Sequence, residues 1–162
     1  MSVAFRRDGD EEHLEPKFEI PIPPGPNLVT ARGKALIDEQ VRSFAAKLEA
    51  APDDASKEAA KRDLRYWQTR QITAEIMLPP VGDKIEFGAT VSFTLQGKPR
   101  TLTIVGTDEA DGAQGLISFT APLARALMDA EPGELLPFGG KDDAIEVLAV
   151  TMLPVEPDRS AP

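Results

Sequence analysis

Ile104-Val-Gly-Thr-Asp-Glu-Ala-Asp111 is the stretch of this 162-residue chain that decides its fold. It lies between Phe87-Gly-Ala-Thr-Val91 and Leu116-Ile-Ser-Phe-Thr-Ala-Pro-Leu-Ala-Arg-Ala-Leu127. Apolar and polar residues alternate from Ile85 to Phe93, and Gln96-Gly-Lys-Pro99 has the composition of a tight turn. Alternation with a period of two is typical of β-strands that bury one face. We therefore expect antiparallel strands around this turn.

The residues that follow predict one short helix and a last strand. Pro122 suits the first turn of a helix that runs to Met128, because proline at that place loses no helical hydrogen bond. Ser118 or Thr120 can cap this helix. A final strand is expected from Ala144 to Met152.

Helical periodicity precedes the strands. From Arg32 to Ala50 apolar residues recur at three- and four-residue steps, and Thr30 is a good N-cap. Pro52-Asp-Asp54 breaks the pattern, and either aspartate can cap a second helix from about Ala55 to Leu78. Two helices joined by so short a turn run antiparallel, so we expect a hairpin roughly 30 to 36 Å long.

The chain thus divides into four segments. The first is rich in acidic residues and proline, a composition that cannot bury enough apolar area to order itself. The predicted fold class is α+β, with an antiparallel helical hairpin before a small antiparallel β domain that carries one short helix. The expected boundaries are 1–26 for a disordered acidic tail, 27–80 for the hairpin, 81–153 for the β domain and 154–162 for a flexible tail.

Composition excludes several chemistries. The chain has no cysteine, and His13 is its one histidine, so disulfides, thiolate metal sites, a zinc centre and a histidine-dependent triad are excluded. It has no run of eighteen apolar residues, and its first residues lack the apolar segment of a secretion signal. We expect a cytoplasmic protein with no membrane partner and no cofactor of its own.

Charge is distributed unevenly along the chain, whose formal net charge is −9. Residues 1–30 carry three basic and six acidic side chains, residues 31–78 nine and eight, and residues 79–162 six and thirteen. Only the middle segment is not acidic. Because phosphate repels an acidic protein, strong binding to free DNA is not expected.

The three quoted stretches resemble, in their order, the C-terminal domain of the bacterial GreA/GreB transcript-cleavage factors. Asn27-Leu-Val-Thr-Ala-Arg-Gly33 is similar to the family's opening of the first hairpin helix, and Lys61-Arg-Asp-Leu64 resembles its returning helix. The resemblance implies an FKBP-like fold for the C-terminal domain and a coiled coil for the hairpin. It also implies a partner, because in the family this domain docks on the rim of the secondary channel of RNA polymerase while the hairpin reaches toward the catalytic metal.

The turn of the hairpin is where the resemblance places chemistry. Family members carry a Gly-Asp-x-x-Glu-Asn-Ala motif there, whose carboxylates help to hold a second Mg²⁺ in the polymerase active site. Here the turn reads Pro52-Asp-Asp-Ala-Ser-Lys-Glu-Ala59, without the glycine and the asparagine. Asp53, Asp54 and Glu58 are the candidate catalytic residues, near the 3′ end of the nascent RNA. Asp53 and Asp54 are candidate metal ligands only within the polymerase site, and the alternative is that they simply cap the second helix.

Five residues of the C-terminal domain are candidates for docking to the polymerase. Three are acidic residues in the loop that follows Val105 and Gly106, and two belong to the expected short helix. For the acidic residues the alternative is a solvated loop, and for the arginine it is an ordinary charge on a helix surface. The candidates are Asp108, Glu109, Asp111, Pro122 and Arg125.

Three functions remain open from sequence. The first is a monomeric regulator that binds RNA polymerase and stimulates cleavage of backtracked RNA through the polymerase's own Mg²⁺, without being an enzyme itself. The hairpin is shorter than a typical Gre hairpin by roughly three turns per arm, about 15 Å, which resembles the Rnk proteins. That length favours an alternative regulator, which occupies the channel and competes with Gre factors without cleavage. A prolyl isomerase is suggested by the FKBP-like fold alone, and fold does not carry function.

Overall fold

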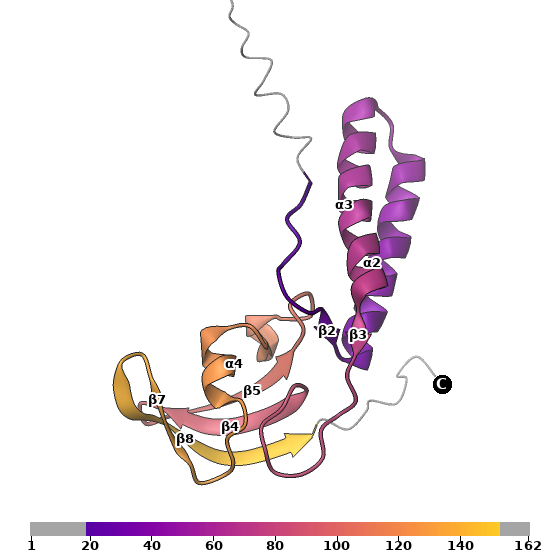
Figure 1. Ribbon diagram of the computed structural model, residues 1–162. Coiled ribbons are helices and arrows are strands. Elements are labelled where there is room, and N and C mark those ends of the chain that lie inside the picture. The colour runs from indigo at the N-terminus through magenta and orange to yellow at the C-terminus, as the bar shows by residue number, and fades with distance from the viewer. Residues whose placement is uncertain (1–18, 153–162) are drawn as a thin grey trace, which may run out of the picture. The chain divides into compact units, whose positions relative to one another are not determined.

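The computed structural model describes residues 19–152, which form two compact units (Figure 1). We call residues 19–26 and 35–73 the hairpin unit, and residues 27–34 and 74–152 the β unit. The elements are, in chain order, β2 (Leu28–Val29), α2 (Ala31–Ala50), α3 (Asp54–Thr73), β3 (Glu75–Ile76), β4 (Ala89–Leu95), β5 (Lys98–Val105), the 3₁₀-helix η2 (Gly112–Gln114), β6 (Leu116–Ser118), α4 (Pro122–Leu127), β7 (Leu135–Phe138) and β8 (Lys141–Met152).

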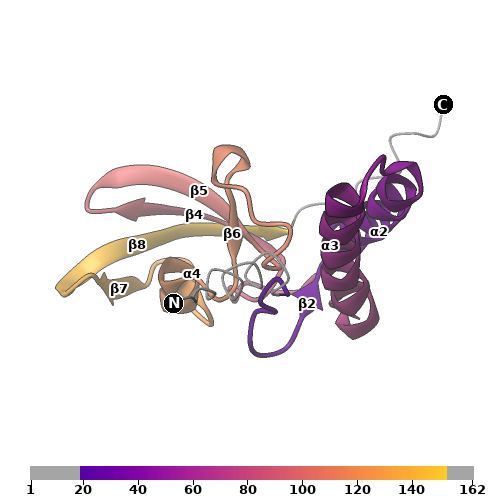
Figure 2. The same ribbon diagram turned by 90° about the horizontal axis from the view of Figure 1, so that it is seen from above.

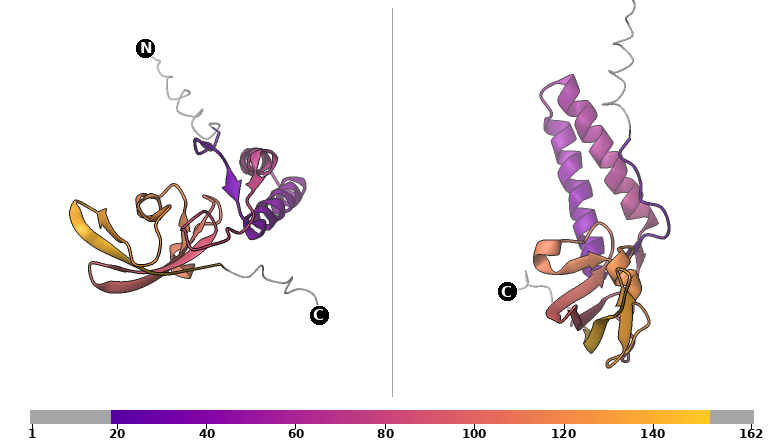
Figure 3. Two further views of the ribbon diagram at one scale, coloured as in Figure 1. Left: turned by 60° about the horizontal axis from the view of Figure 1, so that its bottom comes forward. Right: turned by 90° about the vertical axis from the view of Figure 1, so that its left-hand side faces the viewer.

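The predicted helical hairpin is confirmed. Each of α2 and α3 has 20 residues, which corresponds to about 30 Å at the standard rise of 1.5 Å per residue. The two helices run side by side in opposite directions (Figure 3). Ile37 and Ala60 are buried between more exposed positions, and Gln71 of α3 donates a hydrogen bond to Asp38 of α2 at 2.9 Å. The hairpin is thus held by a narrow apolar seam and polar contacts.

The prediction that the second helix runs to Leu78 was wrong. Instead α3 ends at Thr73, and β3 pairs in parallel with β2. The amide of Glu75 donates to the carbonyl of Asn27, and the amide of Met77 to that of Val29, both at 2.8 Å. A backbone engaged in this pairing cannot continue a helix. Leu78, the last residue of the expected helix, is 83% exposed.

The β unit contains a five-stranded sheet in the order β6-β5-β4-β8-β7 (Figure 2). The pairs β4–β5, β4–β8 and β7–β8 are antiparallel, as predicted. The pair β5–β6 is parallel, which corrects the expected all-antiparallel sheet. A parallel neighbour requires a crossover connection, and the segment between Val105 and Leu116, with η2 inside it, supplies one.

The core of the β unit lies between this sheet and α4. The short helix contributes Ala124 and Leu127, which are fully buried against side chains of the central strands. Burial of this kind contributes about 25 cal/mol per Å² of apolar surface, so these few large residues carry much of the stability. The largest fully buried side chains of the unit are Ile85, Val91, Phe93, Ile104, Val105, Leu127, Ile145 and Val147.

The helix α4 begins at Pro122 as predicted, but neither predicted cap is used. Its N-cap is Ala121, which has no side-chain hydrogen bond to the helix. The hydroxyl of Ser118 instead accepts from the amide of Thr120 at 3.2 Å and shares a hydrogen bond with its hydroxyl at 2.8 Å. The two residues stabilise the turn before the helix rather than the helix itself.

No helix within residues 19–152 is both long enough and apolar enough to cross a membrane.

The close approach of two backbones gives a first prediction. A Cβ at Gly106 would collide with the carbonyl oxygen of Leu28, whereas nothing lies within 4 Å of a Cβ at Gly112. We expect Gly106→Ala to lower the free energy of unfolding by about 1–3 kcal/mol, because a backbone atom cannot move away as a side chain can. Gly112→Ala, the matched control, should change it by less than about 1 kcal/mol. Urea unfolding of both variants measures this, and equal midpoints would contradict it.

Candidate functional site

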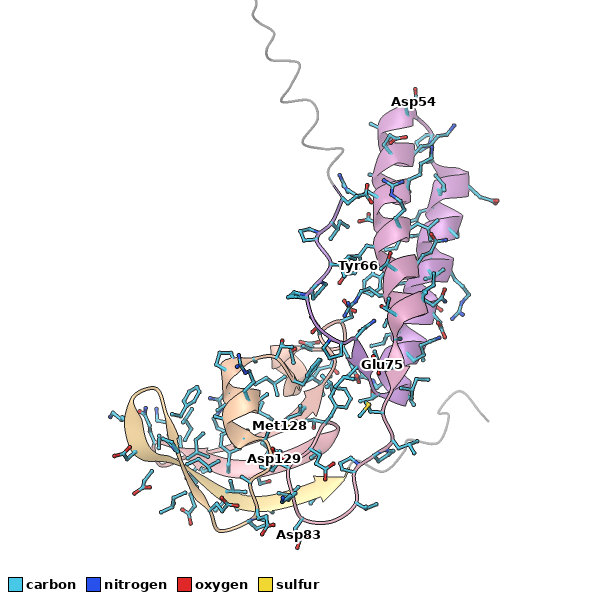
Figure 4. The ribbon with its side chains drawn as sticks, in the orientation of Figure 1. Asp54, Tyr66, Glu75, Asp83, Met128 and Asp129 are labelled. Atoms are coloured by element: carbon cyan, nitrogen blue, oxygen red, sulfur yellow. The ribbon has the colours of Figure 1, made fainter. Side chains whose placement is uncertain are left out.

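The turn of the hairpin is built around the carboxylate of Asp53. Its Oδ1 accepts a hydrogen bond from the amide of Ser56 at 2.8 Å, so Asp53 is the N-cap of α3. This hydrogen bond from the Ser56 backbone, helped by the Ser56 side chain, lowers the pKa of Asp53. Asp54 begins the helix and lies at its outer end (Figure 4). The helix-capping alternative is thereby confirmed for Asp53.

The third candidate at the turn, Glu58, faces a lysine. Its carboxylate lies 3.5 Å from the Nζ of Lys61, one turn further along α3, and both side chains are about half exposed. An exposed pair of this kind contributes little to stability. The oxygen ligands at the turn suit Mg²⁺ chemically, although one oxygen of Asp53 is already engaged. Within the part of the chain that the structure describes, no three acidic or histidine side chains are gathered in a way that could hold a metal ion.

The predicted docking residues come from two segments that the fold brings together. The amide of Phe119 donates to the carbonyl of Val105 at 2.9 Å, and the hydroxyls of Thr107 and Ser118 lie 3.2 Å apart. These contacts place the loop that carries Asp108 beside the turn that leads to Pro122. The two segments therefore form one surface, which we call the loop surface (residues 106–114 and 118–125).

Asp111 organises the loop surface from within. Its Oδ1 accepts from the amide of Ala113 and its Oδ2 from the side-chain amide of Gln114, each at 3.0 Å. It is the N-cap of η2, and Gly115 closes that short helix in the left-handed conformation. Pro122 and Arg125 are exposed on α4. Of the other predicted docking residues, Asp108 and Asp111 are half-buried and Glu109 is buried.

Glu109 is buried, unlike the other predicted docking residues, and the sequence did not reveal this. Its side chain is only 4% exposed, and its two oxygens bind the start of α2. The hydroxyl of Thr30 donates to Oε1 at 2.6 Å, and Nη1 of Arg32 donates to Oε2 at 2.9 Å. Glu109 can therefore contribute to docking only by holding its loop in place.

A glycine makes this arrangement possible. A Cβ at Gly33 would lie 2.8 Å from Oε1 of Glu109, closer than real Cβ contacts. The amide of Gly33 donates to the hydroxyl of Thr30 at 2.9 Å, which confirms Thr30 as the predicted N-cap. We call Thr30, Arg32, Gly33 and Glu109 the α2 anchor. All four belong to the β unit. In the sequence Glu109 is more than seventy residues away from the other three, so only the Thr-x-Arg-Gly opening could have signalled the site.

The α2 anchor gives a second prediction. We expect Glu109→Ala to lower the free energy of unfolding by about 1.5–3 kcal/mol, because it removes a charged acceptor and leaves the Thr30 hydroxyl without an acceptor for its proton. Glu109→Gln keeps an acceptor oxygen and should cost less. Glu86→Ala, an exposed glutamate of the same unit, is the control and should be near neutral. Chemical denaturation distinguishes the three, and a Glu109→Ala variant as stable as the control would refute the anchor.

The fold and the turn together define a class of protein. A helical hairpin with acidic residues at its turn precedes a small mixed-sheet unit that carries the loop surface. Residues 79–152 match the family model described as the C-terminal domain of transcription elongation factor GreA/GreB. GreA of Pseudomonas putida is 32% identical over 136 residues, which cover 83% of this chain and 82% of that protein. The chain belongs to the GreA/GreB family.

Other relatives match a smaller part of the chain. GreA of Desulfovibrio desulfuricans is 38% identical over 88 residues, which cover 50% of this chain and 54% of that protein. GreB of Neisseria meningitidis is 34% identical over 95 residues, covering 54% of this chain and 58% of that protein. The chain thus spans about half the length of these curated relatives.

Solved structures of family members also match. Gfh1 of Thermus thermophilus is 20% identical with a TM-score of 0.37, over 78% of this chain and 99% of that one. A GreA/GreB factor from Nitrosomonas europaea is 18% identical with a TM-score of 0.38, over 79% and 99%.

Proposed function

We propose that this protein regulates transcription by binding bacterial RNA polymerase at its secondary channel, with the β unit docking on the rim and the hairpin entering the channel. Membership of the GreA/GreB family supports the partner. The antiparallel hairpin of α2 and α3 supports the mode of action, because a slender rod about 30 Å long fits a narrow channel. The loop surface, with exposed Pro122 and Arg125, is the proposed docking face.

Channel occupancy without cleavage is the form of this function that the hairpin supports best. The observation that carries it is the length of the arms, 20 residues each. The family resemblance implies that typical Gre arms are roughly three turns longer, about 15 Å at the standard rise. Inner-sphere contacts to Mg²⁺ are about 2.1 Å, so a tip that stops far short cannot act as a ligand. The engagement of Asp53 as a helix cap points the same way.

Stimulated cleavage of backtracked RNA is the second candidate, and the outward position of Asp54 favours it (Figure 4). In that case Asp54 and Glu58 would lend oxygen ligands to Mg²⁺ of the polymerase, and the catalysis would belong to the polymerase. The protein acts in either case as a monomeric accessory factor with no cofactor of its own. An FKBP-like fold for the β unit also belongs to this proposal, supported by a sheet that packs on one short helix.

Two assays on a stalled, backtracked complex separate the two forms. We expect the protein to produce no RNA 3′-end cleavage of its own and to reduce the cleavage stimulated by a full-length Gre factor at least several-fold when it is in excess. The reason is competition for one channel. The Asp53→Asn, Asp54→Asn double variant should compete as well as wild type, because asparagine still caps a helix.

The controls decide between the outcomes. Arg125→Glu changes the charge of the proposed docking face at an exposed position and should weaken competition. Lys98→Glu makes the same kind of charge change at the start of β5, whereas the loop surface follows the end of that strand, and it should leave competition unchanged. Cleavage by the protein itself that disappears in the double aspartate variant would establish the second form. Neither cleavage nor competition at any concentration would reject the channel proposal altogether.

A further inference from the structure

The segment Glu19–Pro26 lies along the outside of α3 (Figures 1 and 4). Segment and helix belong to the same hairpin unit. Glu19 contacts Arg65 through two parallel hydrogen bonds, from Nε to Oε1 and from Nη2 to Oε2, each at 2.7 Å. This forked arrangement fixes both the distance and the relative orientation of the carboxylate and the guanidinium. A lysine, which makes a single-point contact, would not do so.

Apolar side chains continue the contact beyond the ion pair. Ile20 and Ile22 line a hollow of about 390 Å³ together with Tyr66, Thr69 and Ile72 of α3. Both isoleucines border this hollow, so both lie on the side of the segment that is next to α3. The hollow is open, since Ile22 remains 44% and Ile72 81% exposed.

The segment is suited to this role by its prolines. Its sequence is Glu19-Ile-Pro-Ile-Pro-Pro-Gly-Pro26, and within it the structure has neither helix nor strand. Proline fixes φ and favours the extended polyproline conformation, which lowers the entropy lost when such a chain binds. The charge also matches, because residues 1–26 carry six acidic side chains and α3 carries five basic ones against three acidic.

We propose that the face of α3 from Arg65 to Ile72 is a binding site for an extended acidic–apolar peptide, occupied by the protein's own Glu19–Ile22, and that a partner segment of the same chemistry binds by displacing it. The recognised pattern is a carboxylate for the Arg65 fork followed by apolar residues that lie against α3 near Tyr66 and Ile72. This site lies on the side of the hairpin rather than at its turn, and it does not depend on the proposed binding to the polymerase channel.

The contacts are of a strength that permits exchange. The carboxylate of Glu19 and the guanidinium of Arg65 are each about half exposed, and exposed ion pairs contribute little on their own. The tethered segment gains from an effective concentration on the order of millimolar. An untethered peptide therefore competes poorly with it, and a variant that weakens the tethered copy should open the site.

The test uses the full-length protein and a fluorescent peptide with the sequence of residues 19–26, followed by fluorescence anisotropy. In Glu19→Lys the tethered segment is repelled by Arg65, so we expect this variant to bind the peptide at least about 10-fold more tightly than wild type. The control Glu39→Lys makes the same charge change in the exposed Glu39–Arg42 pair of α2 and should behave like wild type. In the double variant Glu19→Lys, Arg65→Glu we expect no peptide binding. The charges at positions 19 and 65 are then reversed but still opposite, so the tethered segment occupies the site again.

Three results would overturn the proposal. They are equal peptide affinity of Glu19→Lys and Glu39→Lys, binding that survives Arg65→Glu, and binding to no variant at peptide concentrations of about 1 mM. All the substituted side chains are exposed, so the fold should be retained, and unchanged unfolding midpoints verify this.

Discussion

The carboxylate of Glu109 is the interaction on which the arrangement of the β unit depends most. A charge that is almost fully buried is costly unless every oxygen is satisfied, and here the two oxygens are taken by Thr30 and Arg32 at the start of α2. The same loop continues into η2 and the parallel strand β6, and Gly33 and Gly106 keep the backbones close enough for these contacts. One acidic side chain thus connects the first helical turn to the loop surface proposed for docking.

The hairpin unit, unlike the β unit, is signalled by residues close together in the sequence. Its helices are marked by caps, apolar spacing and a proline at the turn, so local signals suffice to predict them. At the turn, structure and any function can draw on the same group, because the carboxylate of Asp53 caps the helix and is also of the kind that can bind a metal ion. A helix cap can be fulfilled by Asp53 alone, which leaves Asp54 and Glu58 as the residues that a partner would meet.

Family membership says which proteins this chain is related to, and the geometry says which contacts its own side chains make. The match over residues 79–152 and the relative that spans most of the chain place the protein among the GreA/GreB factors. The geometry adds a feature on the side of the hairpin, where an acidic, proline-rich segment lies against α3 and lines a hollow with Arg65 and Tyr66. Composition alone had suggested that residues 1–26 cannot order themselves. Residues 1–18 lie outside the described part, but Glu19–Ile22 make specific contacts because α3 supplies the partner surface.

The sequence by itself determined the elements whose signals are local. These are the Thr30 cap, the two helices with the turn at Pro52, the hairpin turn at Gln96 and the start of α4 at Pro122. Only the tertiary structure decided the early end of α3, the parallel pair β5–β6 and the burial of Glu109. The physical reason is that these three depend on hydrogen bonds between residues far apart in the chain. A helical pattern is overridden when a distant strand offers backbone partners, and an acidic residue in a loop is solvated or buried according to what the fold brings against it.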